Sequence, residues 1–169
     1  MTLLLGGCST SAGTGAANKN PAPGPTTSSA GNTGAACTGG AKETDPGIVR
    51  ITCAGPAEIR IQAGTVSKDL HGGMCQSAGD VWSANVGVIV DETGAHGAYA
   101  GPPPTNVAVN NTAAAGKATI QAELDGKHYF DLGNATITLS NQGKTAHLEG
   151  TSEALSDAPN AKITVDVTC

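Results

Sequence analysis

Residues 118–131 read ATIQAELDGKHYFD. From Ala118 to Leu124 apolar and polar side chains alternate, which is the period of two that a half-buried strand requires. Asp125-Gly126 follows directly, and glycine tolerates the positive φ that a tight two-residue turn needs. The stretch therefore predicts a β-hairpin whose second strand covers residues 127–131.

Similar alternation recurs on both sides of this hairpin, and it is clearest at 57–62. Residues 94–105 contain three consecutive prolines and are predicted to form a loop, because proline cannot donate to a strand ladder. Residues 66–74 are irregular and are expected to hold one short helical turn. Strands are predicted at 48–53, 57–62, 81–91, 118–124, 127–131, 134–140, 144–153 and 162–169, and residues 106–110 are a candidate for a short edge strand. About eight strands without a convincing helix predict an all-β fold, either an antiparallel sandwich or a strongly curved sheet.

Composition excludes several classes of function. The chain has 169 residues, enough for one domain, and its 9 Lys and Arg against 14 Asp and Glu give a net charge of −5. Binding to nucleic acid needs a surplus of Lys and Arg for phosphate contacts, and the net negative charge excludes this class of function. Single-strand binding also needs aromatic rings for stacking, and the chain has only one Trp, two Tyr and one Phe. No apolar run reaches the roughly 18 residues of a membrane-spanning helix.

The N-terminal segment indicates lipid attachment. Cys8 follows Leu5-Gly6-Gly7 and precedes a long polar stretch. This order is typical of a bacterial lipobox, in which the cysteine thiol takes a diacylglycerol and becomes the new N-terminus. Residues 1–7 are interpreted as the remnant of a lipoprotein signal peptide, because they lack Lys and Arg and are too few for a complete one.

Residues 8–44 are interpreted as the lipidated Cys8 followed by a disordered tether of Gly, Ser, Thr and Pro. Such a composition buries too little apolar surface to offset the entropy lost on ordering. A flexible chain of this length reaches about 30–35 Å on average. The β-rich domain is then assigned to residues 45–169.

Four cysteines remain after Cys8, namely Cys37, Cys53, Cys75 and Cys169. An even set in an exported protein predicts two disulfides, with three possible pairings. The absence of a Cys-x-x-Cys spacing argues against a zinc site. Strand parity turns both Cys53 and Cys169 toward the core and favours a bridge between them, which leaves Cys37 to pair with Cys75.

Several segments together resemble a known family. Besides the lipobox and the tether, they are ITCAG at 51–55 leading into EIRIQAG at 58–64, and the terminal ITVDVTC at 163–169. These segments resemble the mycobacterial nineteen-kilodalton lipoprotein antigen family (LpqH-like), and residues 143–155 are similar to its penultimate strand. The match covers residues 47–64 and 143–169, as expected of a divergent member.

The resemblance implies an acylated antigen at the cell surface with no established enzymatic activity. In this family the acylated N-terminal cysteine is sensed by Toll-like receptor 2 on host cells. The resemblance also implies a disulfide between a cysteine early in the domain and a terminal Val-Thr-Cys, and the matching positions here are Cys53 and Cys169. Cys37 and Cys75 depart from the family's two-cysteine pattern.

Motifs for catalysis and metal binding are missing from the sequence. The histidines are scattered, at His71, His96, His128 and His147. His71 lies near Asp69 and His96 near Glu92, but no His-x-His or His-Glu-x-x-His spacing occurs. The carboxylates at 80, 91 and 92 lack the order of a calcium loop, and no Gly-x-Ser-x-Gly elbow is present. We therefore expect no catalytic residues, no metal and no cofactor.

Trp82 and Tyr99 flank the long strand predicted at 81–91. They are the residues from which a ligand groove could be built. A place in the hydrophobic core is the interpretation we favour for Trp82.

The sequence supports two functional hypotheses from different classes. The first is a lipid-anchored lipoprotein antigen, located at the cell membrane on its extracytoplasmic face or at the cell surface. It would be a non-enzymatic interaction module, held in the membrane by acyl chains such as palmitate, with host receptors or envelope lipids as partners. The alternative is a periplasmic carrier of a lipid or glycolipid in a curved sheet. Its cavity would be lined by Val86, Val88, Val90, Ile120, Ala122 and Leu124. A third, weaker hypothesis is a subunit of an envelope assembly.

Overall fold

A computed structural model of the chain describes residues 37–112 and 114–169. Cys8 and most of the predicted tether lie outside the described residues. The strands are β1 (Ile48–Thr52), β2 (Ala57–Ala63), β3 (Val66–Ala78), β4 (Val81–Val90), β5 (Asn106–Asn111), β6 (Lys117–Leu124), β7 (Lys127–Ser140), β8 (Thr145–Thr151) and β9 (Lys162–Thr168), with a short 3₁₀ helix η1 (Asn141–Gly143). In this part of the chain no helix is long and apolar enough to cross a membrane.

Eight of these strands close into an antiparallel barrel. The hydrogen-bonded order is β4-β3-β2-β9-β8-β7-β6-β5, and β5 pairs back with β4. The additional strand β1 pairs with the second half of β4, from Gly87 to Val90. The predicted all-β antiparallel class is therefore confirmed. The sandwich is wrong, because pairing continues around the ring and leaves no gap between two separate sheets.

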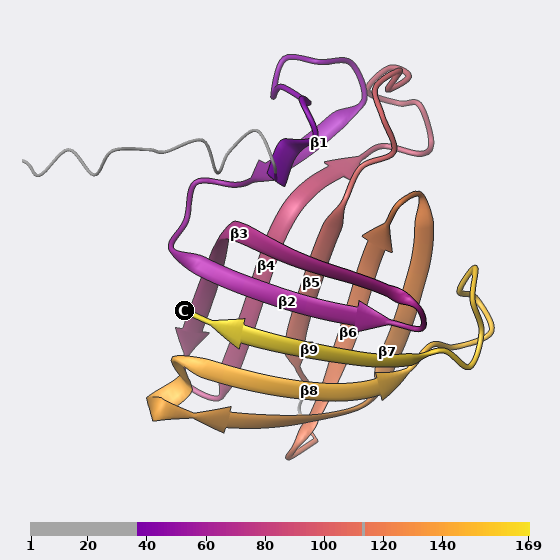
Figure 1. Ribbon diagram of the computed structural model, residues 1–169. Helices are drawn as coiled ribbons and strands as arrows, with labels where there is room; N and C mark the ends of the chain where they lie inside the picture. The colour runs from indigo at the N-terminus through magenta and orange to yellow at the C-terminus, as the bar shows by residue number, and fades with distance from the viewer. Residues whose placement is uncertain (1–36, 113) are drawn as a thin grey trace, which may run out of the picture.

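The corners of the barrel are made by the two longest strands, β3 and β7. Residues 66–73 of β3 pair with β2, whereas residues 74–78 pair with β4. In β7, residues 127–136 pair with β6 and residues 136–140 pair with β8. Strands that bend in this way carry the sheet from one layer to the other. Figure 1 accordingly shows a front layer, made of β2, β9 and β8, that crosses in front of a back layer made of β4, β5 and β6.

A glycine in the left-handed region lies at each bend. Gly72 has φ +91°, and a Cβ at this position would lie 2.3 Å from the Cys53 carbonyl oxygen. Gly133 has φ +114° and lies where the β6–β7 register skips from Leu132 to Ala135. Glycine adopts such angles without a steric penalty, so these positions permit the bulges that bend β3 and β7.

A buried carboxylate stabilises the β7 corner. Asp131 is 2% exposed, and its Oδ1 accepts hydrogen bonds from the backbone N–H groups of Asn134 and Ala135, both at 2.8 Å. Its Oδ2 accepts from the N–H of Thr151 in β8 at 3.0 Å. Three donors compensate the desolvation of the charge and tie the bulge to the neighbouring strand.

The barrel interior is filled mainly by aliphatic side chains that alternate with outward polar ones. In β2 every second residue from Ala57 to Ala63 is buried, as the sequence predicts. Trp82 is the largest buried side chain, 2% exposed, and its Nε1 donates to the Gly143 carbonyl at 2.9 Å. The interpretation of Trp82 as a core residue is confirmed. Cys37 and Ala41, which precede the predicted domain boundary, are also buried.

The disulfides join Cys37 to Cys53 and Cys75 to Cys169. Two disulfides among these four cysteines are confirmed, but the predicted pairing, Cys53–Cys169 with Cys37–Cys75, is wrong. Parity correctly placed Cys53 and Cys169 against the core. However, Cys53 follows β1, which lies beside β4 and not beside β9. Cys75 and Cys169 lie beyond the last paired residues of β2, so their disulfide links the two strands that flank β2.

One predicted irregular segment is a strand. Residues 66–74, expected to hold a helical turn, form most of β3. Leu70 is the one large inward side chain that is buried there, and the glycine pair at 72–73 interrupts the alternation at the corner. The strands predicted at 127–131 and 134–140 are the two arms of the single bent strand β7.

Candidate functional site

The front layer of the barrel carries a row of charged side chains across four strands. Asp69 in β3, Arg60 in β2, Asp166 in β9 and His147 in β8 are successive register partners. Side chains directly opposite each other in antiparallel strands lie on the same face, which here is the outer one. Arg60 Nε lies 2.6 Å from Asp69 Oδ1, and His147 Nδ1 lies 2.7 Å from Asp166 Oδ1. The hydrogen bond that Arg60 donates to Asp69 is the main cause that raises the pKa of Arg60.

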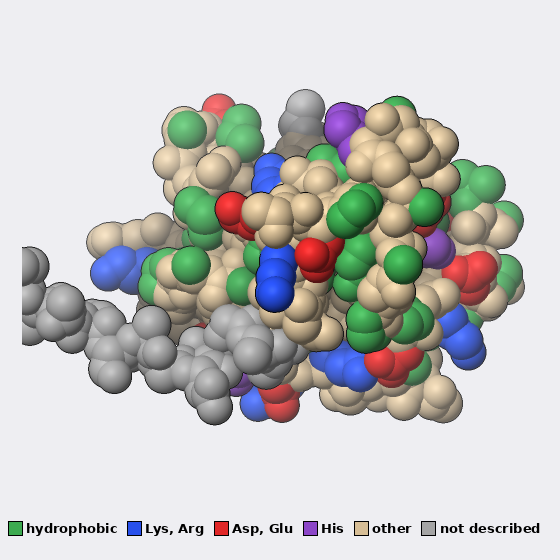
Figure 2. Space-filling view, turned by 90° about the horizontal axis from the view of Figure 1, so that it is seen from above, with side chains coloured by type: hydrophobic (Ala, Val, Ile, Leu, Met, Phe, Trp, Pro, Cys, Tyr) green, Lys and Arg blue, Asp and Glu red, His purple; other side chains and the backbone are tan. Residues whose placement is uncertain are grey.

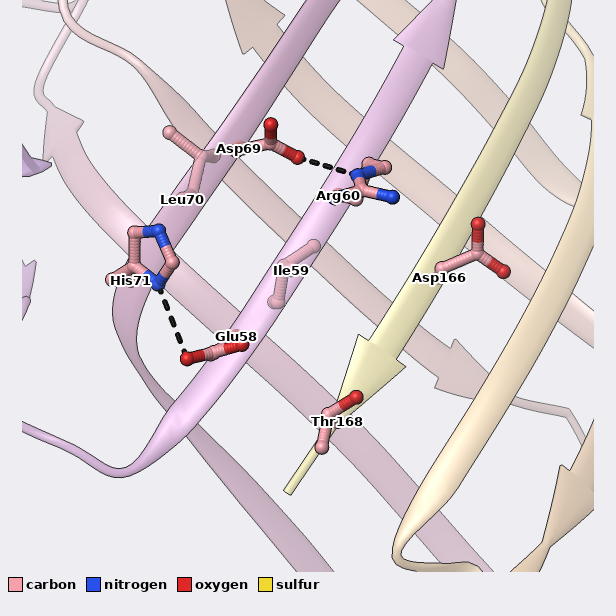
Figure 3. A pocket seen from close by; sticks show the side chains of 8 residues that line it. All are labelled: Glu58, Ile59, Arg60, Asp69, Leu70, His71, Asp166 and Thr168. Atoms are coloured by element: carbon pink, nitrogen blue, oxygen red, sulfur yellow. Dashed lines mark hydrogen bonds and ion pairs between the residues drawn. The ribbon is translucent and has the colours of Figure 1, made fainter.

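Two further ion pairs flank this row. His71 Nδ1 lies 3.4 Å from Glu58 Oε1, and Lys162 Nζ lies 3.3 Å from Glu149 Oε1. Figure 3 shows the first of these pairs beside Arg60 and Asp69, at a shallow depression of about 260 Å³ that Thr168 also lines. We call the eight charged side chains together the charged face: Glu58, Arg60, Asp69, His71, His147, Glu149, Lys162 and Asp166.

The charged face is nearly neutral as a whole. Its four carboxylates face two permanent cations, Arg60 and Lys162, so the sum is −2 with neutral histidines and zero with both protonated. The side chains are half to three-quarters exposed, and pairs of this kind contribute between zero and about 1 kcal/mol each, reduced further by salt. These pairs therefore determine the charge pattern of the surface and contribute little to the stability of the fold.

This arrangement offers polar contacts and not an assembled catalytic centre. Among the described residues no Ser or Thr hydroxyl is hydrogen-bonded to a histidine ring. In the same residues no group of three or more His, Cys, Asp or Glu side chains converges as metal ligands would. His71 and Asp69, which were predicted to lie near each other, are neighbours on the same face of β3. They do not pair with each other, because each pairs with a residue of β2.

The histidine predicted near Glu92 has a different partner. His96 Nδ1 lies 2.9 Å from Asp91 Oδ2. Asp91 also accepts hydrogen bonds from the Thr93 hydroxyl and from the backbone N–H of His96. These bonds, that from Thr93 foremost, hold the pKa of Asp91 far below its usual value. Asp91 therefore organises the loop after β4. Asp80 precedes β4 at its other end, so the candidate calcium carboxylates are not brought together.

Trp82 and Tyr99 do not form a common groove. Trp82 lies at the start of β4 and is buried. Tyr99 lies beside Gly47, which is hydrogen-bonded to Asp91 at the far end of the same strand. At about 3.3 Å per residue, β4 separates these two places by roughly 30 Å.

Most of the stripe proposed to line a carrier cavity lies in the barrel interior. Val86, Ile120, Ala122 and Leu124 are at most 2% exposed and belong to one continuous hydrophobic cluster. Val88 is also fully buried, whereas Val90, at the rim, is only partly buried. The side chains of this stripe therefore pack against other apolar side chains.

A cluster of titratable groups at the rim of the barrel has no signal in the local sequence. His128 Nε2 lies 2.9 Å from Glu92 Oε1, and its Nδ1 lies 3.1 Å from Asp157 Oδ2. Glu123, the register partner of His128, is 8% exposed and accepts a hydrogen bond from Asn106 Nδ2 at 3.0 Å. Burial raises the pKa of Glu123. Figure 2, seen from above, shows acidic and basic side chains scattered among each other over the described part of that end.

Both the charged row and the rim cluster depend on cross-strand register. The alternation at 58–62 signals that these side chains point outward, but not which residues of other strands lie beside them.

Comparisons with protein-family models, with curated proteins and with solved structures found no match to this chain.

Proposed function

We propose that this chain is a lipid-anchored, non-enzymatic interaction module of the cell envelope or cell surface. One observation carries the proposal: all four cysteines after Cys8 are paired in disulfides. Disulfides form and persist in oxidising compartments, which supports export of the chain. The remaining cysteine of the sequence, Cys8, stands in the lipobox-like Leu5-Gly6-Gly7-Cys8. More than one acyl chain at this position would make membrane attachment stable.

The interaction role draws support from the outer surface. The charged face combines paired acidic and basic side chains with an open depression, which suits polar contacts with a partner. The proposal includes recognition of the acylated N-terminus by host receptors, as the LpqH-like resemblance implies. Since Cys53 and Cys169 are bonded to other cysteines, the proposal places the chain as a divergent member of that family.

The carrier alternative has one supporting observation, the closed ring of eight strands. Barrels of this size either fill with side chains or hold one small ligand. Four of the six side chains that would line such a cavity are packed within the hydrophobic cluster, so the interaction module is the better supported of the two.

The first test is the intact mass of the protein extracted from the membranes of its own cells, with and without reductant. The expected result is a mass increase of acyl-chain size and a gain of four hydrogens on reduction, two for each disulfide. A Cys8→Ala variant should move to the soluble fraction, while the matched Ser9→Ala variant stays with the membrane. An unmodified chain, or membrane attachment that survives Cys8→Ala, would contradict the proposal. Non-protein mass that dissociates on denaturation would favour the carrier.

A further inference from the structure

The outer surface of the back layer differs from the charged face, because two adjacent rows of side chains there carry no charge. Each row crosses five strands from β3 through β4, β5 and β6 to β7, as successive register partners. We call these ten side chains the neutral face. The rows are Met74, Asn85, Ala108, Gln121 and Phe130, and beside them Gln76, Ser83, Asn110, Thr119 and Leu132.

Charged groups lie only at the margins of the neutral face within the described residues. At one margin the next register partners are Glu123 and His128, and the carboxylate of Glu123 is buried. At the other margin Lys117 Nζ donates to the Asn134 carbonyl at 3.0 Å. At the β7 end Glu153 Oε1 accepts hydrogen bonds from the backbone N–H of Leu132 at 3.0 Å and from Asn134 Nδ2 at 3.1 Å. The two rows themselves therefore carry no charge.

Most of the polar groups on this face are available to a ligand. Thr119 donates its hydroxyl proton to Asn110 Oδ1 at 2.5 Å. The side-chain amides of Asn85 and Gln121, by contrast, make no hydrogen bond to any other described residue. Gln121 is exposed and Asn85 is partly exposed, and a carboxamide offers both donors and an acceptor.

An apolar platform lies at one end of the rows. Phe130 is partly exposed, and its ring stacks on that of His128 at 5.8 Å. Leu132, in the neighbouring row, is 47% exposed. Amides and hydroxyls beside an aromatic ring fit a ligand that has many hydroxyl groups and apolar C–H faces but no charge.

We propose that the neutral face binds a neutral polysaccharide. Sugar hydroxyls both donate and accept hydrogen bonds, as the amides do, and the C–H face of a pyranose ring can rest on Phe130. Four strand spacings give a row of about 19 Å, the length of roughly four pyranose rings. The ten side chains of the two rows offer no countercharge to a charged ligand. A protein partner would be expected to meet an apolar, aromatic centre rather than amides.

This inference names a partner class for the proposed interaction module and rests on that proposal, but the two fail separately. Loss of polysaccharide binding with acylation intact would remove this inference alone. Absence of acylation with binding retained would remove the membrane anchor alone.

The test is affinity electrophoresis of the full chain, carrying Cys8→Ser, in native gels that contain an α-glucan, a mannan, a galactan or the polyanion heparin. We expect retardation by at least one neutral polysaccharide, and we expect it to persist at about 0.5 M salt, because no ion pair is involved. The double variant Asn85→Ala/Gln121→Ala should bind about tenfold more weakly, since two hydrogen-bonding groups are lost. The matched control is Gln62→Ala, which removes the same type of side chain from the opposite layer and should bind as the parent does.

Three results would overturn the proposal: no retardation by any neutral polysaccharide, retardation by heparin alone, or a folded double variant that binds as tightly as the Gln62→Ala control. Circular dichroism and the melting temperature establish that the variants are folded. If the double variant does not fold, Gln121→Ala alone replaces it, because that side chain is exposed.

Discussion

Replacing both Cys75 and Cys169 with alanine removes the disulfide that links β3 to the end of the chain after β9. Its two cysteines are 94 residues apart, whereas Cys37 and Cys53 are 16 residues apart. In the chain-entropy treatment a disulfide destabilises the unfolded state more as the loop that it closes becomes longer. The two bridges should therefore differ in what they contribute to stability.

The magnitudes follow from these loop lengths. A loop of about 100 residues corresponds to about 4.7 kcal/mol at 25 °C, and one of about 15 residues to about 3 kcal/mol. Cys75→Ala/Cys169→Ala should therefore lower the free energy of unfolding by about 1.7 kcal/mol more than Cys37→Ala/Cys53→Ala does.

Urea unfolding of both double variants, in a Cys8→Ser background, measures this difference. The slope of each transition must be compared as well, because removing a crosslink expands the unfolded chain and changes the slope. Thiol titration of Cys37→Ala/Cys53→Ala checks the pairing, since the remaining cysteines should be bonded to each other and give no free thiol. Two free thiols, or a larger loss of stability from the Cys37/Cys53 variant, would refute the reasoning.

Three other substitutions test the buried and hydrogen-bonded carboxylates. Asp131→Ala should lower the free energy of unfolding by about 3 kcal/mol or more in urea unfolding, because it leaves three backbone N–H groups without an acceptor, and an unchanged midpoint would contradict this. Glu123→Gln should raise stability at pH 7 and have no such effect below about pH 4, because a carboxyl whose pKa is raised by folding opposes folding once the pH exceeds its unfolded value. A variant that is less stable than the parent at pH 7 would contradict this sign. Asp91→Asn should lower stability at neutral pH, and in an acid titration its deficit should shrink as the pH falls from about 4 toward the depressed pKa, since a lowered pKa stabilises the fold above the unfolded value. A deficit that grows on acidification would count against this assignment.

Local alternation was sufficient to predict most strands. In β2 and β9 every second residue is apolar and buried, so the alternation in the sequence matches the alternation of buried and exposed side chains. The Asp125-Gly126 turn has φ values of +52° and +71°, which are those of the tight hairpin predicted from this dipeptide.

The corners of the barrel could not be predicted in the same way. At Gly72 and Gly133 the strands continue while the register shifts, so the period of two is interrupted although the element is not. The sequence therefore favoured an irregular segment at residues 66–74 and two short strands in place of β7. The disulfide pairing was missed for a related reason: parity tells which way Cys53 points, but not that β1 lies outside the ring.

The surface sites depend on register still more strongly. Arg60 and Asp69 lie on consecutive strands of one hairpin, but Asp166 joins them only because β2 also pairs with β9, which is distant in sequence. The same holds for Asn85 and Gln121, which become part of one row only through β5. No spacing within one segment contains this information.

The Cys37–Cys53 disulfide also determines how the domain would respond to mechanical load. A pull on the chain N-terminal to Cys37 passes through the sulfur atoms to Cys53 and bypasses residues 38–52, which include β1. The force therefore reaches β2 first, and this strand is hydrogen-bonded to β3 on one side and to β9 on the other. The edge strand β1, which pairs only with β4, therefore bears no tension, and the first strand to be loaded belongs to the wall of the barrel.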